Sequence, residues 1–278
     1  MKNKNSAVKI WARLTSAIVF GTIIFIFLYV FLKGIGAISL DFLTQKPKGA
    51  VLGTEGGIFP AIVGSLLFTL VAVLISSILG IATAIYHIFY CKNKCVSFLI
   101  SIVMQCMSGV PSIVLGLFGY SLFVLRFGLG KCILAGGLTQ AIMILPFLEV
   151  RAEKSLREAD KSYINASYSL GATRSYTLRK IVIPQQLPSL VSDVVLAALY
   201  AVGAAAPLIF TGAVILSSVP TSLMKPSMAL PYHLYMLLTQ GTSSQNAYGT
   251  AFVLMALVLI SNILATSFVW RKNKQWTK

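Results

Sequence analysis

The fold class is decided by residues 56–91, which read GGIFPAIVGSLLFTLVAVLISSILGIATAIYHIFYC and lie between Glu55 and Lys92. None of these 36 residues is Asp, Glu, Lys or Arg. An α-helix crosses the hydrocarbon core of a bilayer with about 20 apolar residues, so two spans and a turn would not fit here. We therefore predict one membrane span, over residues 62–89.

The composition of the whole chain indicates a polytopic membrane protein. Of the 278 residues, 57% are hydrophobic and only 11% are charged, whereas about 25% of the residues in soluble domains are charged. These values exclude a cytosolic globular enzyme, a disordered chain and a collagen. Long continuous apolar runs also argue against a transmembrane β-barrel. The fold class that remains is all-α, with several membrane-spanning helices.

Five further uncharged stretches predict five further spans, which makes six in all. They lie at residues 14–32, 95–125, 132–148, 194–215 and 248–270. The first follows a basic head and resembles a signal peptide, but its 19 uncharged residues are long for one, so we expect a retained helix. The stretch 95–125 contains Gly109-Val110-Pro111-Ser112, which predicts a break within that span.

The distribution of basic residues predicts the orientation. The chain has 23 Lys and Arg against 7 Asp and Glu, a net charge of +16. Seventeen basic residues fall in the two terminal tails and in residues 91–95 and 149–193, against six in the alternate loops. Positive charge accumulates in cytoplasmic loops, so both termini are expected in the cytoplasm. We divide the chain into a cytoplasmic tail, 1–13, and one transmembrane domain, 14–278, and expect lipid rather than nucleic acid as the partner of its charge.

The four cysteines are expected to be free thiols. Cys91 and Cys95 form a C-x₃-C pair in a basic loop, and no further ligands at zinc-site spacing follow. A reducing compartment keeps such thiols unpaired. We therefore predict no metal site, and we expect His87 to be a hydrogen-bonded histidine at the inner end of its span.

The cytoplasmic loop 149–193 is longer than a connection between two spans requires. Four residues recur at helical spacing and predict one helix with a shared face: Leu156, Tyr163, Ala166 and Leu170. Gly171 is expected to end this helix, and a second amphipathic piece, residues 176–183, is expected to end at Pro184 and Pro188. The arrangement fits either a docking element for a partner's groove or a helix lying at the lipid headgroups.

A spaced pattern of residues lies within this loop. Asn165-Ala166-Ser167 is followed after three residues by Gly171, and after nine more by Ile181-Val182-Ile183-Pro184. This pattern resembles the cytoplasmic signature of importer permeases of the ATP-binding-cassette class: Glu-Ala-Ala, three residues, Gly, nine residues, Ile-x-Leu-Pro. The spacing agrees throughout, whereas Asn165 and Ser167 depart from the signature.

Four further stretches narrow the resemblance. They are GGIFPAIVG at 56–64, GIATAIY at 80–86, GVPSIVLGL at 109–117 and SLGAT at 169–173. All four look like the A-type permease subunit of the phosphate-specific importer of this class. The resemblance implies the six-span, type I importer architecture and a permease subunit of an ATP-driven phosphate importer in the bacterial cell membrane.

The resemblance also implies partners. These are a second, B-type permease, two copies of a cytoplasmic ATPase and an extracytoplasmic phosphate-binding protein. The chain has no Gly-x-x-x-x-Gly-Lys-[Ser/Thr] phosphate loop, so ATP would be hydrolysed by the separate ATPase, and neither an enzymatic activity nor a bound cofactor is expected here. The residues that would couple the permease to the ATPase are Asn165, Ala166, Ser167, Gly171, Ala172, Ile181 and Pro184.

The predicted fifth span departs from the family in its charges. The family reads Arg-Ala-x-Gly-Glu-Thr-Ala-Pro where this chain reads YAVGAAAP at 200–207, so Tyr200 replaces the Arg and Ala204 replaces the Glu. Ionisable residues within a span commonly mark a pathway. Either the partner permease carries the charges alone, or the substrate or the transport activity has changed.

The candidate pathway residues are therefore few. Ser112 lies beside the predicted break, where freed backbone groups suit an anion. Tyr200 and Ala204 take the places of the family's charges, and Thr211 lies one helical turn after Pro207, where its hydroxyl would also suit a backbone carbonyl. Two alternatives to a phosphate permease stay open: a permease for molybdate or sulfate, and a non-transporting membrane scaffold or sensor subunit.

Overall fold

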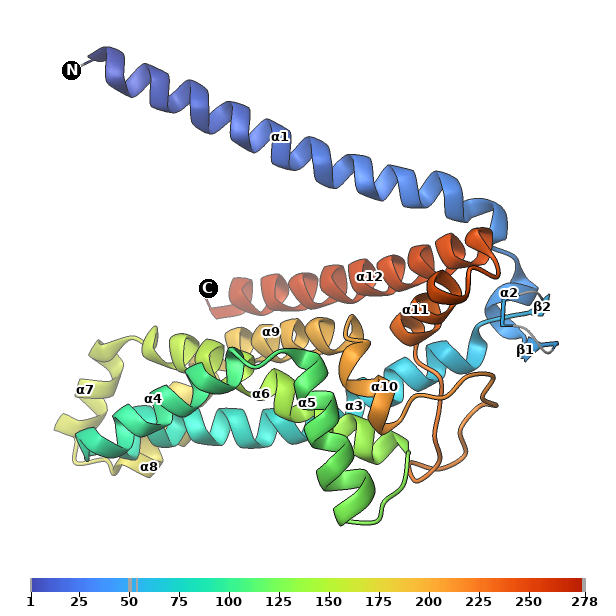
Figure 1. Cartoon of the computed structure of the whole chain (residues 1–278). Coiled ribbons are helices and arrows are strands. Elements are labelled where there is room, and N and C mark those ends of the chain that lie inside the picture. Colours follow the sequence, from blue (N-terminus) through green and yellow to red (C-terminus); the bar gives the residue numbers. More distant parts are fainter. Residues whose placement is uncertain (1, 50–51, 54, 277–278) are drawn as a thin grey trace.

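The computed structural model describes residues 2–49, 52–53 and 55–276, which lie mostly in helices (Figure 1). The α-helices are α1 (Lys2–Gly34), α2 (Leu40–Thr44), α3 (Phe59–Ile85), α4 (Lys94–Ser108), α5 (Ser112–Gly119), α6 (Ile133–Arg157), α7 (Lys161–Ser169), α8 (Arg174–Thr177), α9 (Ile183–Val202), α10 (Ala206–Thr211), α11 (Leu230–Gln240) and α12 (Ser244–Trp276). A 3₁₀ turn, η1 (Ile35–Ala37), and three π-helical turns, η2 (Tyr86–Tyr90), η3 (Tyr120–Arg126) and η4 (Leu178–Val182), extend them. Strands β1 (Pro47–Lys48) and β2 (Glu55–Gly56) form a small antiparallel pair. The predicted all-α class is confirmed, while residues 1, 277 and 278 of the predicted tails lie outside the described residues.

Five helical segments of the described chain are long and apolar enough to cross a membrane, and a bent pair of helices makes a sixth when it is counted as one span. Five are single stretches of sufficient length and apolarity: Val8–Ala37, Phe59–Tyr90, Ile133–Arg157, Arg174–Val202 and Ser244–Leu264. The sixth is a pair, α4 with α5 and η3, bent by 99°. Pro111 precedes the first residue of α5 and has no N–H to continue a helix. The break predicted within residues 95–125 is therefore where the span bends.

Helices α3 and α6 pack closely at the centre of the molecule. Gly136 and Gly137 of α6 face Phe68 and Val71 of α3, and a Cβ on either glycine would lie 2.5 Å from the facing side chain. Phe68 is fully buried. Small residues permit such close approach of membrane helices, where dispersion contacts replace the hydrophobic effect as the driving force.

The fifth span differs from its prediction. The sequence placed it at residues 194–215, but α9 begins at Ile183 and ends at Val202, followed by a break and the short helix α10. Pro184 lies in the first turn of α9 and Pro188 lies inside it, so neither ends a helix. The π-helical turn η4 directly precedes α9, so the helical stretch runs from Arg174 to Val202, and the irregular turn before Pro184 accommodates its missing N–H. The prolines therefore belong to the span and not to the end of the preceding loop helix.

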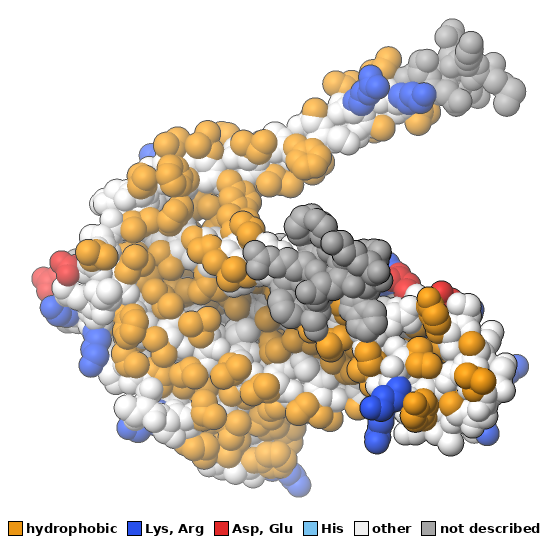
Figure 2. All heavy atoms as spheres, turned by 180° about the vertical axis from the view of Figure 1, so that it is seen from behind, with side chains coloured by type: hydrophobic (Ala, Val, Ile, Leu, Met, Phe, Trp, Pro, Cys, Tyr) orange, Lys and Arg blue, Asp and Glu red, His pale blue; other side chains and the backbone are white. Residues whose placement is uncertain are grey.

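Helix α1 diverges from the rest of the molecule over most of its length (Figure 1). Its contacts with α12 lie near its C-terminal end, where the Tyr29 and Tyr248 hydroxyls are 3.3 Å apart and the Phe31 and Phe252 rings are 5.4 Å apart. Further along, large apolar side chains such as Trp11 are exposed. Hydrophobic side chains also cover much of the face in Figure 2, with Lys and Arg mostly toward its edges. Such a surface requires lipid or another protein.

Candidate functional site

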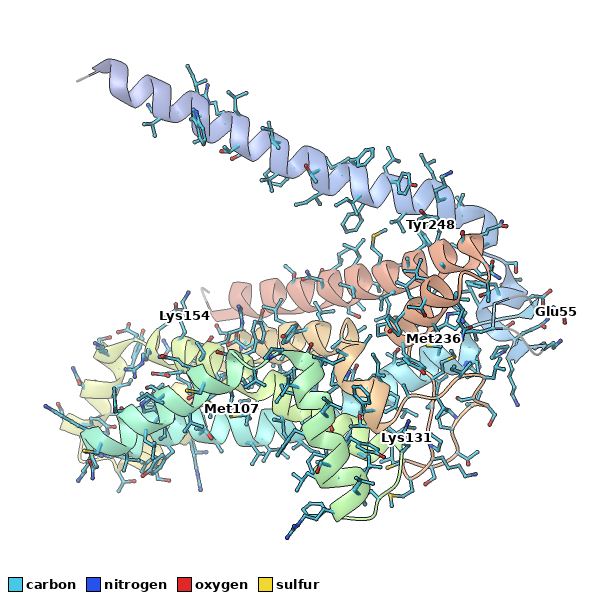
Figure 3. The ribbon with its side chains drawn as sticks, in the orientation of Figure 1. Glu55, Met107, Lys131, Lys154, Met236 and Tyr248 are labelled. Carbon is cyan, nitrogen blue, oxygen red and sulfur yellow. The ribbon has the colours of Figure 1, made fainter. Side chains whose placement is uncertain are left out.

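The bend between α4 and α5 borders a cavity of about 510 Å³. Met107, which comes from α4 and is labelled in Figure 3, lines it together with residues of α5, α6 and α9. The polar and aromatic groups among its lining residues are Ser108, Ser112, Phe147, Arg151 and Tyr200. The bend opens the cavity because α5 turns away from α4 instead of continuing along it. A hollow between helices is where ligand sites of helical proteins commonly form.

Arg151 is the charged residue that lines this cavity. Its Nε donates to Oδ1 of Asp193 on α9 at 3.0 Å, and its guanidinium carbon lies 5.6 Å from the centre of the Phe147 ring. Oδ2 of Asp193 accepts a hydrogen bond from Ser155 at 2.6 Å. Asp193 is nearly fully buried, whereas the Arg151 side chain is 41% exposed. The carboxylate and the ring thus orient a guanidinium whose other nitrogens have no hydrogen-bond partner among the described residues.

The cavity brings together two of the four predicted pathway residues. Ser112 lies at the start of α5, and Tyr200 contributes a half-exposed ring 5.5 Å from that of Phe147. Ala204 and Thr211 do not line it. Thr211 is fully buried, and its hydroxyl donates to the carbonyl of Pro207 at 2.7 Å, as a local backbone contact would.

Ala204 lies in the break after α9 and contacts α6 instead. Gln140 of α6 is almost fully buried, and its Nε2 donates to the carbonyls of Ala201 at 3.1 Å and Ala204 at 3.4 Å. The Ala201 carbonyl lies in the last turn of α9 and also accepts from the Ala204 N–H at 3.0 Å, whereas Ala204 itself lies beyond the end of α9. Tyr200 and Ala204 therefore do not share a continuous helical turn, so the structure separates the two positions at which the resemblance led us to expect charges.

Two features of this region were missed by the sequence reasoning. Arg151 was counted only as one of many loop charges, and Gln140 was not considered. The signal that could have found both is helical continuity, because α6 extends past residue 148 to Arg157. Arg151 then lies on the same membrane-spanning helix as Gln140 and not in a loop.

The cytoplasmic loop consists of α7 and α8 joined at a tight turn. Gly171 has a positive φ of 78°, and the turn shows the Schellman pattern: Ala172 N–H donates to the Ser167 carbonyl at 3.1 Å and Gly171 N–H to the Tyr168 carbonyl at 2.9 Å. The hydroxyls of Ser167 and Thr177 meet at 2.9 Å and connect α7 with α8. Gly171 thus ends α7 as predicted.

Asp160 begins α7. Its carboxylate accepts a hydrogen bond from the Ser162 N–H at 2.8 Å, which satisfies one of the free donors of the first helical turn. This backbone hydrogen bond holds the pKa of the Asp160 carboxyl below its ordinary value. The first turn of the loop helix is therefore held by an ionised cap at neutral pH.

The prediction of one helix with a shared face in this loop is wrong in one respect. Leu156 belongs to the end of α6 and is buried, whereas Tyr163 and Leu170 lie on α7 and at its end and are 60% and 89% exposed. Asn165 and Ala166 are also exposed, and Ala172, Ile181 and Pro184 are half-buried. The break at residues 158–160 places Leu156 on a different helix from Tyr163, Ala166 and Leu170, which the periodicity had assigned to one helix.

Comparison with known proteins places this architecture in a family. The model of the family described as "Binding-protein-dependent transport system inner membrane component" matches residues 76–273. The chain belongs to this family. A probable ABC transporter permease protein of Bacillus subtilis, YqgI, is 28% identical over 91% of this chain and 90% of its own length.

Two further relatives carry a more specific name. Phosphate transport system permease protein PstA 2 of Mycobacterium bovis is 29% identical over 81% of this chain and 75% of its own length. Phosphate transport system permease protein PstA 1 of Mycobacterium tuberculosis is 30% identical over 76% of this chain and 68% of its own length. The resemblance drawn from residues 56–173 and from the loop signature is therefore confirmed at the level of the family.

Solved structures agree with the fold. The MetNI methionine ABC transporter in an inward-facing conformation contains a chain with a TM-score of 0.63 and 18% identity, over 75% of this chain and 92% of its own. A bacterial alginate ABC transporter in complex with a pentasaccharide-bound periplasmic protein contains one with a TM-score of 0.61 and 15% identity, over 95% of each chain. The protein is a multi-pass permease subunit with the importer fold.

Proposed function

We propose that this permease subunit carries phosphate, and that Arg151 contacts the anion in the cavity. The observation that carries the proposal is the oriented guanidinium beside the bend of the α4–α5 span. A guanidinium presents several N–H donors in a planar fork that matches the oxygens of a tetrahedral oxyanion. The names of the relatives at 29% and 30% identity support phosphate as the oxyanion.

The surroundings of Arg151 support an anion rather than a neutral cargo. Ser112 offers a hydroxyl and lies at the start of α5, where the first backbone N–H groups have no intrahelical partner. The positive end of the α5 dipole then favours negative charge at that end of the cavity. The guanidinium and this helix start would take over the task of the charges that Tyr200 and Ala204 no longer provide.

The partners follow from the same proposal. A second, B-type permease would complete the pathway, and two copies of a cytoplasmic ATPase would hydrolyse ATP and dock on the loop that holds α7 and α8. The exposed Tyr163 and Leu170 support the docking role, since exposed apolar side chains suit the groove of a partner. A phosphate-binding protein would deliver the cargo from outside, with both termini of this chain in the cytoplasm.

Uptake of radiolabelled phosphate tests the proposal. A strain that lacks the chain is complemented with the chain and its partners, and Arg151→Gln is compared with Arg151→Lys and with Arg126→Gln, which changes an exposed arginine outside the cavity. We expect Arg151→Gln to lower uptake roughly tenfold or more, as for the loss of a charged hydrogen bond, with Arg151→Lys intermediate and Arg126→Gln unchanged.

Competition separates the cargo from its rivals. Excess unlabelled phosphate should abolish uptake, and sulfate or molybdate should not. If sulfate or molybdate competes better than phosphate, the cargo is another oxyanion. If the complemented strain takes up none of the three while the complex assembles, the chain is a scaffold or sensor subunit and the proposal is wrong.

A further inference from the structure

A second cluster of polar side chains lies between the end of α3 and α6, apart from the cavity. His87 of η2 faces two carboxylates one helical turn apart on α6: its Nδ1 lies 3.4 Å from Oε2 of Glu153 and 3.9 Å from Oε1 of Glu149. One ligand-capable atom from each of the three residues lies within 4.8 Å of the others. Spacing along the sequence could not reveal this set, because Glu149 follows His87 by 62 positions.

The cluster is buried, and its polar atoms are not satisfied. The side chains of His87 and Glu149 are 5% and 2% exposed. Among the described residues, neither Nδ1 of His87 nor Oε1 of Glu149 has a hydrogen-bond partner. Arg157 pairs with Glu153, but through its other oxygen, Oε1, at 2.8 Å from Nε. A buried carboxylate without a partner is costly, so these three groups would be stabilised by a cation or by a proton bound among them.

The orientation of His87 leaves Nδ1 available to receive that charge. Nε2 lies 2.7 Å from the hydroxyl of Ser97 on α4. When Nε2–H donates to this hydroxyl, Nδ1 presents its lone pair to the two carboxylates. A histidine that binds a metal through one nitrogen commonly has its other nitrogen hydrogen-bonded in this way, which sets both the tautomer and the ring plane.

We propose that His87, Glu149 and Glu153 form a binding site for a divalent transition-metal ion of the zinc class. The ligand atoms are Nδ1 of His87, Oε1 of Glu149 and Oε2 of Glu153. Bonds of about 2.1 Å in tetrahedral geometry place ligand atoms about 3.4 Å apart, which matches the distance between His87 and Glu153. An imidazole nitrogen in the set disfavours magnesium and calcium, which prefer oxygen ligands throughout.

Access and position suggest what the ion does. The Glu153 side chain is 21% exposed, so water can reach the site from that side and occupy a fourth coordination position. The ion would connect the end of α3 to α6 just before the loop of α7 and α8 begins. Arg174 of α8 also donates to the carbonyl of Phe89 in η2, at 3.3 Å. The ion would thus stabilise the base of the loop, whatever cargo the permease carries.

Metal binding to the purified full-length chain tests the site. The chain is stripped with a chelator and titrated with Co²⁺, whose visible absorption reports tetrahedral coordination, and with Zn²⁺ against a chromophoric chelator. We expect one equivalent of either ion and a rise in the unfolding temperature with Zn²⁺. Glu149→Gln and His87→Gln should each weaken binding roughly tenfold or more, and Glu158→Gln, an exposed carboxylate at the end of the same helix, should not.

Two outcomes would overturn the proposal. The first is the absence of stoichiometric binding to the wild-type chain. The second is equal loss of binding when Cys91 and Cys95 are both replaced by Ser, which would move the site to those thiols. If Glu149→Gln does not fold, judged by gel filtration, Glu153→Gln takes its place and must weaken binding as well.

Discussion

Helices α1 and α6 are both long enough and apolar enough to cross a membrane, yet they differ in what surrounds them. In α6, 67% of the most apolar stretch is buried within the chain, and in α1 none of it is. The more apolar of the two helices is therefore the less buried one. Apolarity identifies a span, but it does not say whether lipid or protein lies against it.

The polar side chains of α1 and α6 show the difference in their surroundings better than the apolar side chains do. In α1 the hydroxyls of Thr15 and Thr22 bond to carbonyls one turn earlier in the same helix, at 3.0 and 2.9 Å. In α6 the polar groups reach other segments: Gln140 donates to the Ala201 carbonyl in the last turn of α9, and Arg151 pairs with Asp193. A helix that satisfies its polar groups internally can face lipid, whereas α6 needs its neighbours.

The largest effect should come from filling the closest contact of α6. We expect Gly136→Leu to destabilise the chain by at least about 3 kcal/mol, because a Cβ at this position already lies 2.5 Å from the Phe68 ring. At Gly21 of α1 a Cβ meets no atom within 4 Å, so Gly21→Leu should be neutral or stabilising by up to about 1 kcal/mol. Thermal unfolding and the yield of monodisperse protein measure both.

The outcome for Gly21→Leu carries its own information. Gly21→Leu should not affect the isolated subunit. A loss of stability or yield for this variant would contradict the proposed difference between α1 and α6. If it is harmless there but prevents assembly with the second permease, α1 faces a protein partner at residue 21 and not lipid.

A smaller effect is expected where α9 breaks beside α6. Ala204 packs toward α6 and its carbonyl accepts from Gln140, so Ala204→Glu should cost roughly 2.5–3.5 kcal/mol, as a charge placed inside a span does. Tyr200→Arg should cost less than about 1 kcal/mol, because Tyr200 is half exposed at the cavity. Yield of the assembled complex is the measurement.

The double variant sharpens this prediction. If Tyr200 and Ala204 lay on one continuous helix, the new Arg and Glu would be one turn apart and could pair. Because α9 ends at Val202, we expect the double variant to assemble no better than Ala204→Glu alone. Recovery of the Tyr200→Arg yield by the double variant would mean that α9 continues through the break.

The sequence predicted what depends on composition and local chemistry. Charge-free stretches located the first, second, fourth and sixth spans and the bent third one, and Pro111 located the bend, whereas the predicted fifth span overlaps only the end of α9. The spacing from Asn165 to Pro184 led to the family. The ends of the spans were harder to predict, because Pro184 begins a helix in one context and ends one in another.

What depends on contacts between distant segments was not predictable. Ser112 and Tyr200 were proposed separately, and only the fold places both at one cavity with Arg151. His87 was expected to be a satisfied histidine, but its contact with Glu149 requires α3 and α6 to pack in one particular register. A single sequence contains no measure of that register.

The smallest effect concerns the loop that follows α6, where backbone conformation and not packing holds the structure. No atom lies within 4 Å of a Cβ built on Gly171, but its φ of 78° is unfavourable for other residues. We therefore expect Gly171→Ala to destabilise α7 by about 1 kcal/mol, and Gly171→Asn to do so less, because Asn tolerates this conformation better. Gly203→Ala is the matched control, since Gly203 also follows a helix end but has a φ of −78°, and a Cβ there meets only ordinary contacts at 3.8 and 3.9 Å. Hydrogen exchange of the α7 amides should be about fivefold faster in Gly171→Ala and unchanged in Gly203→Ala.

The temperature of global unfolding should hardly change in either variant, because α7 contributes little buried surface. Equal exchange in Gly171→Ala and the wild type would show that the turn adapts to a side chain. In that case the glycine would matter only for what approaches the loop from outside the chain.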